Sequence, residues 1–316
     1  MLGAPCLALS AGLTHVAIDP EPLEAFAAEL ALDPPPLPTW DHPAIPDEAG
    51  PLLDAVVWLG NALNFCYWTP AGEPMWSIAW AGERHDDAMG IFSALRRAAA
   101  EGADLSDGRF LADETDDGPP RIFRPGAGVL PLLGRRIEIL REIGRALVRD
   151  FRGRLERAVE AAGPDAPGMA RFLARTFPSF RDERTYRGVS LPFLKRAQLA
   201  AGMLHARRVA LGAPGLTGTG RLTVYADYML PRALRAKGVL RYAPGLARRV
   251  DAAETLEAGG EEETEIRIAT VAASESLVRQ ARGRGADIDG LRLDYRLWER
   301  GFSAAGEHHR TICTDY

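Results

Sequence analysis

A helical repeat of apolar residues runs through the middle of the chain and leaves few folds open to it. Between Leu133 and Val159, apolar residues recur at three- and four-residue steps, with Arg and Glu between them. This spacing places the apolar side chains on one face of an α-helix. We therefore expect one long amphipathic helix, which Gly163 and Pro164 end.

Similar patterns before and after this repeat predict further helices. Their expected ranges are 54–65, 88–100, 191–211 with Pro192 in its first turn, 222–242, 244–257, 261–282 and 291–300. Met75–Trp80 has the composition of a short strand. Because strands and helices do not alternate, we expect a mainly α, all-helical fold with at most a small β element near residues 75–113.

Proline and glycine divide the chain. The segment DPPPLPTWDHPAIP, residues 33–46, excludes a long helix and predicts an extended strap. We expect residues 1–50 to form this Pro-rich strap, packed on a single helical domain of residues 51–316. The acidic segment 113–128, rich in Gly and Pro, is predicted to be a loop.

Composition and charge exclude several classes of protein. A chain of 316 residues with a net charge of −5 is long enough for a substantial core but has the wrong sign for a surface that follows nucleic acid throughout. No apolar run approaches the roughly 20 residues that cross a bilayer. The three cysteines lie far apart and no basic leader precedes them, which predicts a reducing, cytoplasmic location.

A glycine-rich segment, GAPGLTGTG at 212–220, lies between two expected helices. No strand precedes it, so it does not fit a nucleotide-binding loop. A helix, a glycine hairpin and a second helix resemble the helix-hairpin-helix unit of nucleobase-excising glycosylases. In that unit an acid shortly after the hairpin faces the base, and Asp227 has this place here.

Several stretches in order resemble the queuosine salvage protein family: LNFCYW at 63–68, FPSFRD at 177–182, LKRAQ at 194–198, YADYMLP at 225–231, GVLRY at 238–242, EIR at 265–267 and LDYRLW at 293–298. The resemblance implies a hydrolase that cleaves the N-glycosidic bond of queuosine 5′-phosphate and releases the 7-deazaguanine base queuine for reuse in transfer RNA modification. It also implies an all-helical fold similar to DNA glycosylases, without metal or organic cofactor.

This chemistry requires acids and flat rings. Loss of a base leaves an oxocarbenium-like sugar, which a nearby carboxylate stabilises. A guanine-like edge offers two N–H donors to a second carboxylate, and aromatic rings stack on the base. Tyr225 and Asp227 form one such group, and Asp294, Tyr295 and Glu299 form another on one expected helix, where the two acids lie about 140° apart.

The resemblance also implies roles for individual residues: His42, Tyr225, Asp227, Asp294 and Tyr295 contact the base, and Glu299 takes the place of the catalytic acid. The family often has Asp at the position of Glu299, so Asp294 and Asp227 are alternative sugar-facing acids. For the 5′-phosphate we expect Lys195, with Arg196 as its neighbour.

Other interpretations of these residues and of the chain stay open. Asp227 can be a helix cap, Lys195 a solvated side chain and Tyr295 core packing. The alternative functions are a DNA base-excision glycosylase and a non-catalytic protein that binds queuine or queuosine. For the favoured function we expect queuosine 5′-phosphate and queuine as ligands, no membrane and no stable nucleic-acid complex.

Overall fold

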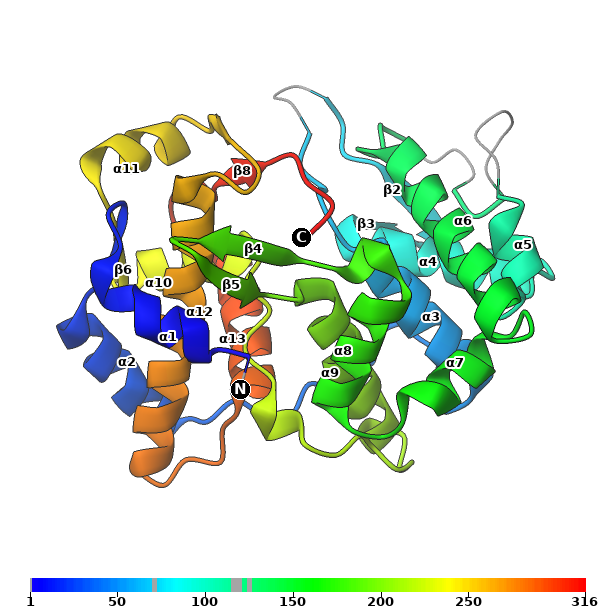
Figure 1. Ribbon diagram of the computed structural model, residues 1–316, viewed down its shortest axis with the longest axis horizontal. Coiled ribbons are helices and arrows are strands. Elements are labelled where there is room, and N and C mark those ends of the chain that lie inside the picture. The colour runs from blue at the N-terminus through cyan, green and yellow to red at the C-terminus, as the bar shows by residue number, and fades with distance from the viewer. Residues whose placement is uncertain (1, 70–72, 115–120, 124–126) are drawn as a thin grey trace.

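Helices form the larger part of the molecule (Figure 1). The computed structural model describes residues 2–69, 73–114, 121–123 and 127–316. Its α-helices are α1 (Ala4–Leu9), α2 (Pro20–Leu32), α3 (Pro51–Ala62), α4 (Asp87–Ala100), α5 (Gly108–Ala112), α6 (Leu133–Asp150), α7 (Leu155–Ala162), α8 (Ala166–Thr176), α9 (Lys195–Ala210), α10 (Met229–Ala236), α11 (Pro244–Asp251), α12 (Glu261–Gly283) and α13 (Gly290–Ser303). In this part of the chain, no helix is both long and apolar enough to span a bilayer.

The fold is mixed, and the prediction of an all-helical chain was wrong. The described strands form four two-stranded sheets. They are β1 (Val16–Ile18) with β6 (Leu240–Tyr242), β2 (Ser77–Trp80) with β3 (Glu83–Asp86), β4 (Glu183–Tyr186) with β5 (Val189–Pro192), and β7 (Thr255–Leu256) with β8 (Arg310–Thr311). Only β2–β3 lies in the predicted range. The others are two to four residues long, too short for a period of two to appear in the sequence.

The β4–β5 hairpin replaces the first turn that was expected for a helix over 191–211. Arg187 and Gly188 form its two-residue turn with φ of 49° and 77°. Positive φ at both positions matches the twist of paired antiparallel strands. The helix therefore begins only at Lys195, and Pro192 ends a strand rather than starting a helix.

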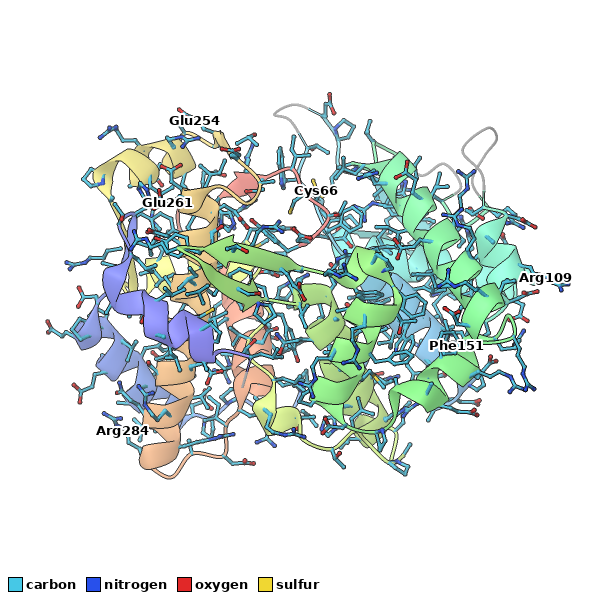
Figure 2. The ribbon with its side chains drawn as sticks, viewed as in Figure 1. Cys66, Arg109, Phe151, Glu254, Glu261 and Arg284 are labelled. Carbon is cyan, nitrogen blue, oxygen red and sulfur yellow. The ribbon has the colours of Figure 1, made fainter. Side chains whose placement is uncertain are left out.

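The predicted helix over 133–159 is broken in two. Helix α6 ends at Asp150, and Phe151 lies at the break, as Figure 2 shows. Arg152 and Gly153 then adopt φ of 53° and 76°, which no α-helix contains. Helix α7 ends where predicted, at Ala162 before Gly163.

No helix-hairpin-helix unit is formed around the glycine-rich segment, which corrects the expected glycosylase-like fold. After α9, the described chain runs through a turn and a short 3-10 helix at Thr219–Arg221. Residues 222–228 are irregular and extended before α10 begins at Met229. The acid at 227 therefore follows an extended segment rather than a hairpin. The loop predicted at 113–128 falls largely outside the described residues.

Two hydrophobic cores organise the molecule. One is built mainly by α3, α4, α6, α8 and α9, and the other by α2, α10, α12 and α13. Figure 1 shows the first group of helices on the right and the second on the left, with the β4–β5 hairpin lying across the second group. Residues 33–50 contain no helix, as the prolines predicted, and they cross from one group to the other.

Candidate functional site

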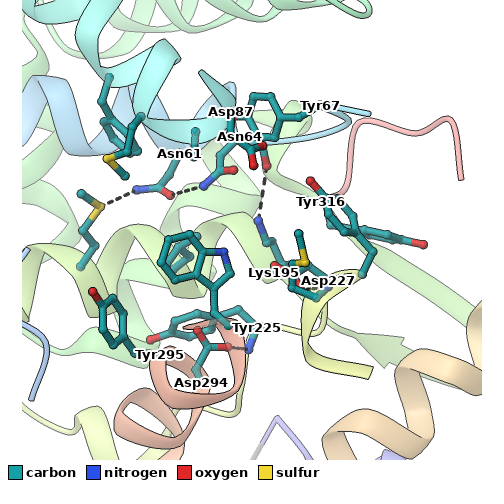
Figure 3. A pocket seen from close by; sticks show the side chains of 18 of the residues that line it. Asn61, Asn64, Tyr67, Asp87, Lys195, Tyr225, Asp227, Asp294, Tyr295 and Tyr316 are labelled. Atoms are coloured by element: carbon teal, nitrogen blue, oxygen red, sulfur yellow. Dashed lines mark hydrogen bonds between the residues drawn. The ribbon is translucent and has the colours of Figure 1, made fainter. Parts of the chain in front are cut away.

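A pocket lies where the two groups of helices meet. Helices α3, α4 and α9 line one side, and α10 and α13 line the other. Its polar lining residues are Asn61, Asn64, Asp87, Lys195, Asp227 and Asp294; its aromatic ones are Trp40, Tyr67, Phe92, Tyr225, Tyr228, Tyr295, Trp298, Phe302 and Tyr316. Figure 3 labels ten of these side chains, which converge from separate elements. Acids enclosed by flat rings are the arrangement that cleavage of a nucleoside requires.

Asp227 enters the pocket from the segment before α10. Its Oδ1 accepts the backbone N–H groups of Met229 at 2.8 Å and Leu230 at 3.2 Å, so the carboxylate caps the helix. Burial raises its pKa, while Lys195 and these two N–H groups oppose that rise. The capping role and a role in the pocket are compatible, because Oδ2 has no hydrogen-bond partner among the described residues.

Asp294 enters from α13 and is held by the backbone of Tyr225, whose N–H donates to its Oδ1 at 2.7 Å. Burial raises the pKa of Asp294 well above its usual value, and the nearby charge of Asp227 adds to this shift. Two neighbouring carboxyls that compete for ionisation are common in sites where one must carry a proton.

Lys195 is the first residue of α9 and lies buried between these groups. Its backbone N–H donates to Oδ2 of Asp182 at 3.0 Å, and its Nζ donates to the carbonyl of Asn64 at 3.4 Å. Burial lowers the pKa of its ammonium group, while Asp227 and Asp294 oppose the shift. Among the described lining residues it is the one Lys or Arg side chain.

Three aromatic rings cluster in the pocket lining near Asp294. The ring of Trp40 lies 5.3 Å from that of Tyr295 and 6.3 Å from that of Trp298, measured between centroids. Trp40 belongs to the extended segment 33–50, which Arg207 of α9 fixes by donating to the carbonyls of Thr39 and Pro46. The proline-rich segment thus brings a stacking surface to the pocket.

Tyr225 is packed so closely on α9 that one position there must be glycine. A Cβ on Gly202 would lie 2.0 Å from the Tyr225 hydroxyl. Tyr225 lines the pocket, and its hydroxyl is buried without a hydrogen-bond partner among the described residues. A buried hydroxyl without a partner is costly, which favours a ligand that supplies one.

We expect Gly202→Ala to push Tyr225 out of place. Because a tyrosine ring cannot bend away, the overpacking should cost about 1 to 3 kcal/mol of the free energy of unfolding and raise KM. Thermal unfolding measures the loss of stability, and steady-state kinetics measure the change in KM. Gly245→Ala is the matched control, since a Cβ there meets nothing within 4 Å. Equal behaviour of the two variants would contradict the close packing of Tyr225.

The structure brings together most of the residues that the sequence predicted for a site. Lys195, Tyr225, Asp227, Asp294 and Tyr295 all line the pocket. His42 and Glu299 do not belong to its lining.

His42 and Glu299 lie elsewhere. The ring of His42 is half-buried against His85, with centroids 4.9 Å apart, and burial lowers its pKa. Glu299 is exposed on α13, on the side of Tyr295 away from Asp294. Arg196 points away from the pocket and donates to the carbonyls of Ala62 and Ser179.

Other lining residues were not predicted. In the sequence, Asp87 is only one of two adjacent acids before an expected helix, a pattern that does not indicate a site. Trp40 stands in a segment whose one recognisable feature is its prolines. Tyr316 is held in the pocket wall by Glu263, which accepts its hydroxyl at 2.8 Å. Only a tertiary fold can bring residues 40, 87 and 316 together. The described residues include no group of three or more His, Cys, Asp or Glu side chains placed to hold a metal ion.

Comparisons with known proteins agree on one family. A family described as "Queuosine salvage protein" matches residues 49–316. A protein of Sphaerobacter thermophilus is 38% identical over 278 residues, which cover 88% of this chain and 84% of the relative. A mouse protein is 27% identical over 82% of this chain and 81% of its own length. Both relatives are named queuosine 5′-phosphate N-glycosylase/hydrolase.

Proposed function

The chain belongs to the queuosine salvage protein family, and from this premise we propose that its pocket hydrolyses the N-glycosidic bond of queuosine 5′-phosphate and releases queuine. It is an N-glycoside hydrolase. The observation that carries the proposal is the meeting of Asp227 and Asp294 in one pocket enclosed by aromatic rings. Relatives from bacteria and eukaryotes share the hydrolase name, which disfavours a DNA glycosylase or a mere binding protein.

Asp294 is our candidate for binding the base. Its Oδ2 has no hydrogen-bond partner among the described residues, and it lies beside Tyr225 and near Trp298 and Tyr295. A guanine-like base can stack on these rings and donate its two edge N–H groups to the carboxylate. Such donors favour the ionised acid, so we expect base binding to lower the pKa of Asp294 and release its proton.

Asp227 is our candidate for the acid that faces the sugar. Burial raises the pKa of both acids, and the charge of Asp227 helps to raise that of Asp294 well above its usual value, whereas Lys195 and the two N–H groups that begin α10 oppose the rise at Asp227. A carboxylate held in a cavity of low dielectric stabilises the positive charge that develops on the ribose. We propose this role for Asp227 rather than Glu299, because the exposed carboxylate of Glu299 is solvated.

The departing base must be stabilised in another way than the sugar. A 7-deaza base has carbon in place of N7, so the usual protonation of a departing purine at that atom is closed to it. Hydrogen bonds to the rest of the ring must stabilise the negative charge instead, and the unpartnered Tyr225 hydroxyl is one available donor. Lys195 is the candidate for contact with the 5′-phosphate, because its side chain carries the one ammonium group among the described residues that line the pocket.

The cellular setting is also part of the proposal. The three cysteines are unpaired in the structure, which supports a reducing cytoplasm. The net charge of −5 supports a free nucleotide rather than a nucleic-acid duplex as substrate.

The direct test is release of the base. Purified protein incubated with queuosine 5′-phosphate is expected to produce free queuine and ribose 5-phosphate. Mass spectrometry detects and quantifies both products. Heat-denatured protein is the control for spontaneous hydrolysis. Absence of queuine at every protein concentration would refute the proposed activity.

A further inference from the structure

Asp87 is a third acid of the pocket and takes no part in the proposed contacts to the base edge, the ribose or the phosphate. It is the first residue of α4, and its φ of 50° lies in the left-handed region that glycine adopts freely and aspartate tolerates. The side chain lines the pocket. No hydrogen bond or ion pair engages its carboxylate within the described part of the chain, which leaves it available to a ligand.

Asp87 faces the pocket from the side opposite to Asp294. Figure 3 shows Asp87 with Asn64 and Tyr67 on one side, Asp294 with Tyr295 on the other, and Lys195 between them. Burial raises the pKa of Asp87 to about 7, and Asp86 and Asp227 add to the shift. With one ammonium group against three acids, the described lining has room for a further positive charge.

The shape of the substrate directs such a charge toward Asp87. Queuosine carries an amine on a side arm at C7, and this secondary amine is protonated at neutral pH. C7 and the glycosidic nitrogen N9 both belong to the five-membered ring of the base. The two N–H donors belong to the six-membered ring, at the opposite end of the base. A base with its edge on Asp294 and its ribose at Asp227 therefore points its arm away from Asp294, toward the wall that contains Asp87.

We propose that Asp87 is a specificity residue that pairs with the ammonium group of the queuosine side arm. The inference rests on the proposed function, because it uses the placement of the base and the ribose. An ammonium group bound by a partly buried carboxylate forms a charge-assisted hydrogen bond, stronger than one between neutral groups. The pairing would select queuosine over 7-deazaguanine nucleotides that lack a charged arm.

Binding of the free bases tests this role without relying on turnover. Isothermal titration calorimetry compares queuine with 7-deazaguanine, which lacks the arm. We expect Asp87→Asn to weaken queuine binding about 10- to 100-fold and to change 7-deazaguanine binding less than about twofold. Asp87→Gly should show the same selectivity and suits the left-handed backbone, so it serves if the asparagine variant folds poorly.

The matched control is Asp47→Asn, which removes the same charge from an exposed residue outside the pocket lining and should leave both affinities unchanged. Equal losses for the two bases, or an unchanged affinity of Asp87→Asn for queuine, would overturn the proposal. If the wild-type protein released queuine in the hydrolysis assay yet showed no preference for queuine over 7-deazaguanine, this inference would fall and the proposed function would stand. If it neither released nor bound queuine, both would fall.

Discussion

Replacing Asp227 with asparagine is expected to lower kcat by roughly 10³-fold, because one neutral amide cannot stabilise a sugar cation. The amide keeps an oxygen that can accept the N–H groups of Met229 and Leu230, so the cap of α10 should persist. Single-turnover kinetics with queuosine 5′-phosphate measure the loss. Circular dichroism and thermal unfolding establish that the variant is folded.

Glu299→Gln decides between the two candidate acids. Its carboxylate is exposed and outside the pocket lining, so we expect a smaller loss of kcat than for Asp227→Asn. A loss as large as that of Asp227→Asn would return the sugar-facing role to Glu299, which the family resemblance implied. Wild-type kcat in Asp227→Asn would leave Asp227 with its capping role alone.

Asp182→Asn is expected to lower the free energy of unfolding by about 3 to 5 kcal/mol, since it leaves a buried guanidinium group with Glu263, 3.8 Å away, as its one ion-pair partner within the described residues. Asp182 pairs with Arg267 at 2.6 Å, and their side chains are only 1% and 0% exposed. The same carboxylate accepts the backbone N–H of Lys195, and Arg267 donates to the carbonyl of Ala226 at 3.1 Å. This ion pair therefore joins α12 to the backbone beside both Lys195 and Asp227.

Urea unfolding as a function of pH tests the ion pair. Burial alone would raise the pKa of Asp182, but Arg267 and the Lys195 N–H outweigh it and hold the pKa below its usual value. The ionised Asp182 carboxylate therefore contributes its full stabilisation above the pKa of about 4 that it has in the unfolded chain. That contribution is lost as the pH falls through the lower pKa of the folded protein. The difference between wild type and Asp182→Asn should shrink in that acid range.

Asp251→Asn is the matched control for Asp182→Asn. Asp251 pairs with Arg235 at 2.7 Å, but its side chain is 53% exposed. Surface ion pairs contribute about 0 to 1 kcal/mol. Similar losses in the two variants would contradict a special role for the buried pair.

Long helices were predictable and their interruptions were not. The expected helices near α3, α4, α12 and α13 are present, because each carries a continuous apolar face. The break at Phe151 and the hairpin turn at Arg187 both depend on non-glycine residues with positive φ. Residues other than glycine rarely adopt such a φ, so no local propensity indicates these positions in the sequence.

The candidate site was predictable in part. Tyr225, Asp227, Asp294 and Tyr295 were found from a chemical requirement and a family resemblance, and all four line the pocket. Asp87 and Trp40 were missed, because neither stands in a stretch with a recognisable pattern. The sequence also could not show that Asp182 would pair with Arg267, 85 residues away.

By itself, the order of residues determined the mainly helical content, the family and the acids available for glycoside cleavage. These properties follow from local periodicity and from residue identity, which the chain carries wherever it lies in space. Only the tertiary structure decided which acids are shielded from water and which remain solvated. Asp227 and Asp294 became neighbours in one pocket while Glu299, on the same helix as Asp294, stayed outside, because the packing of α10 and α13 buries one side of a helix and exposes the other.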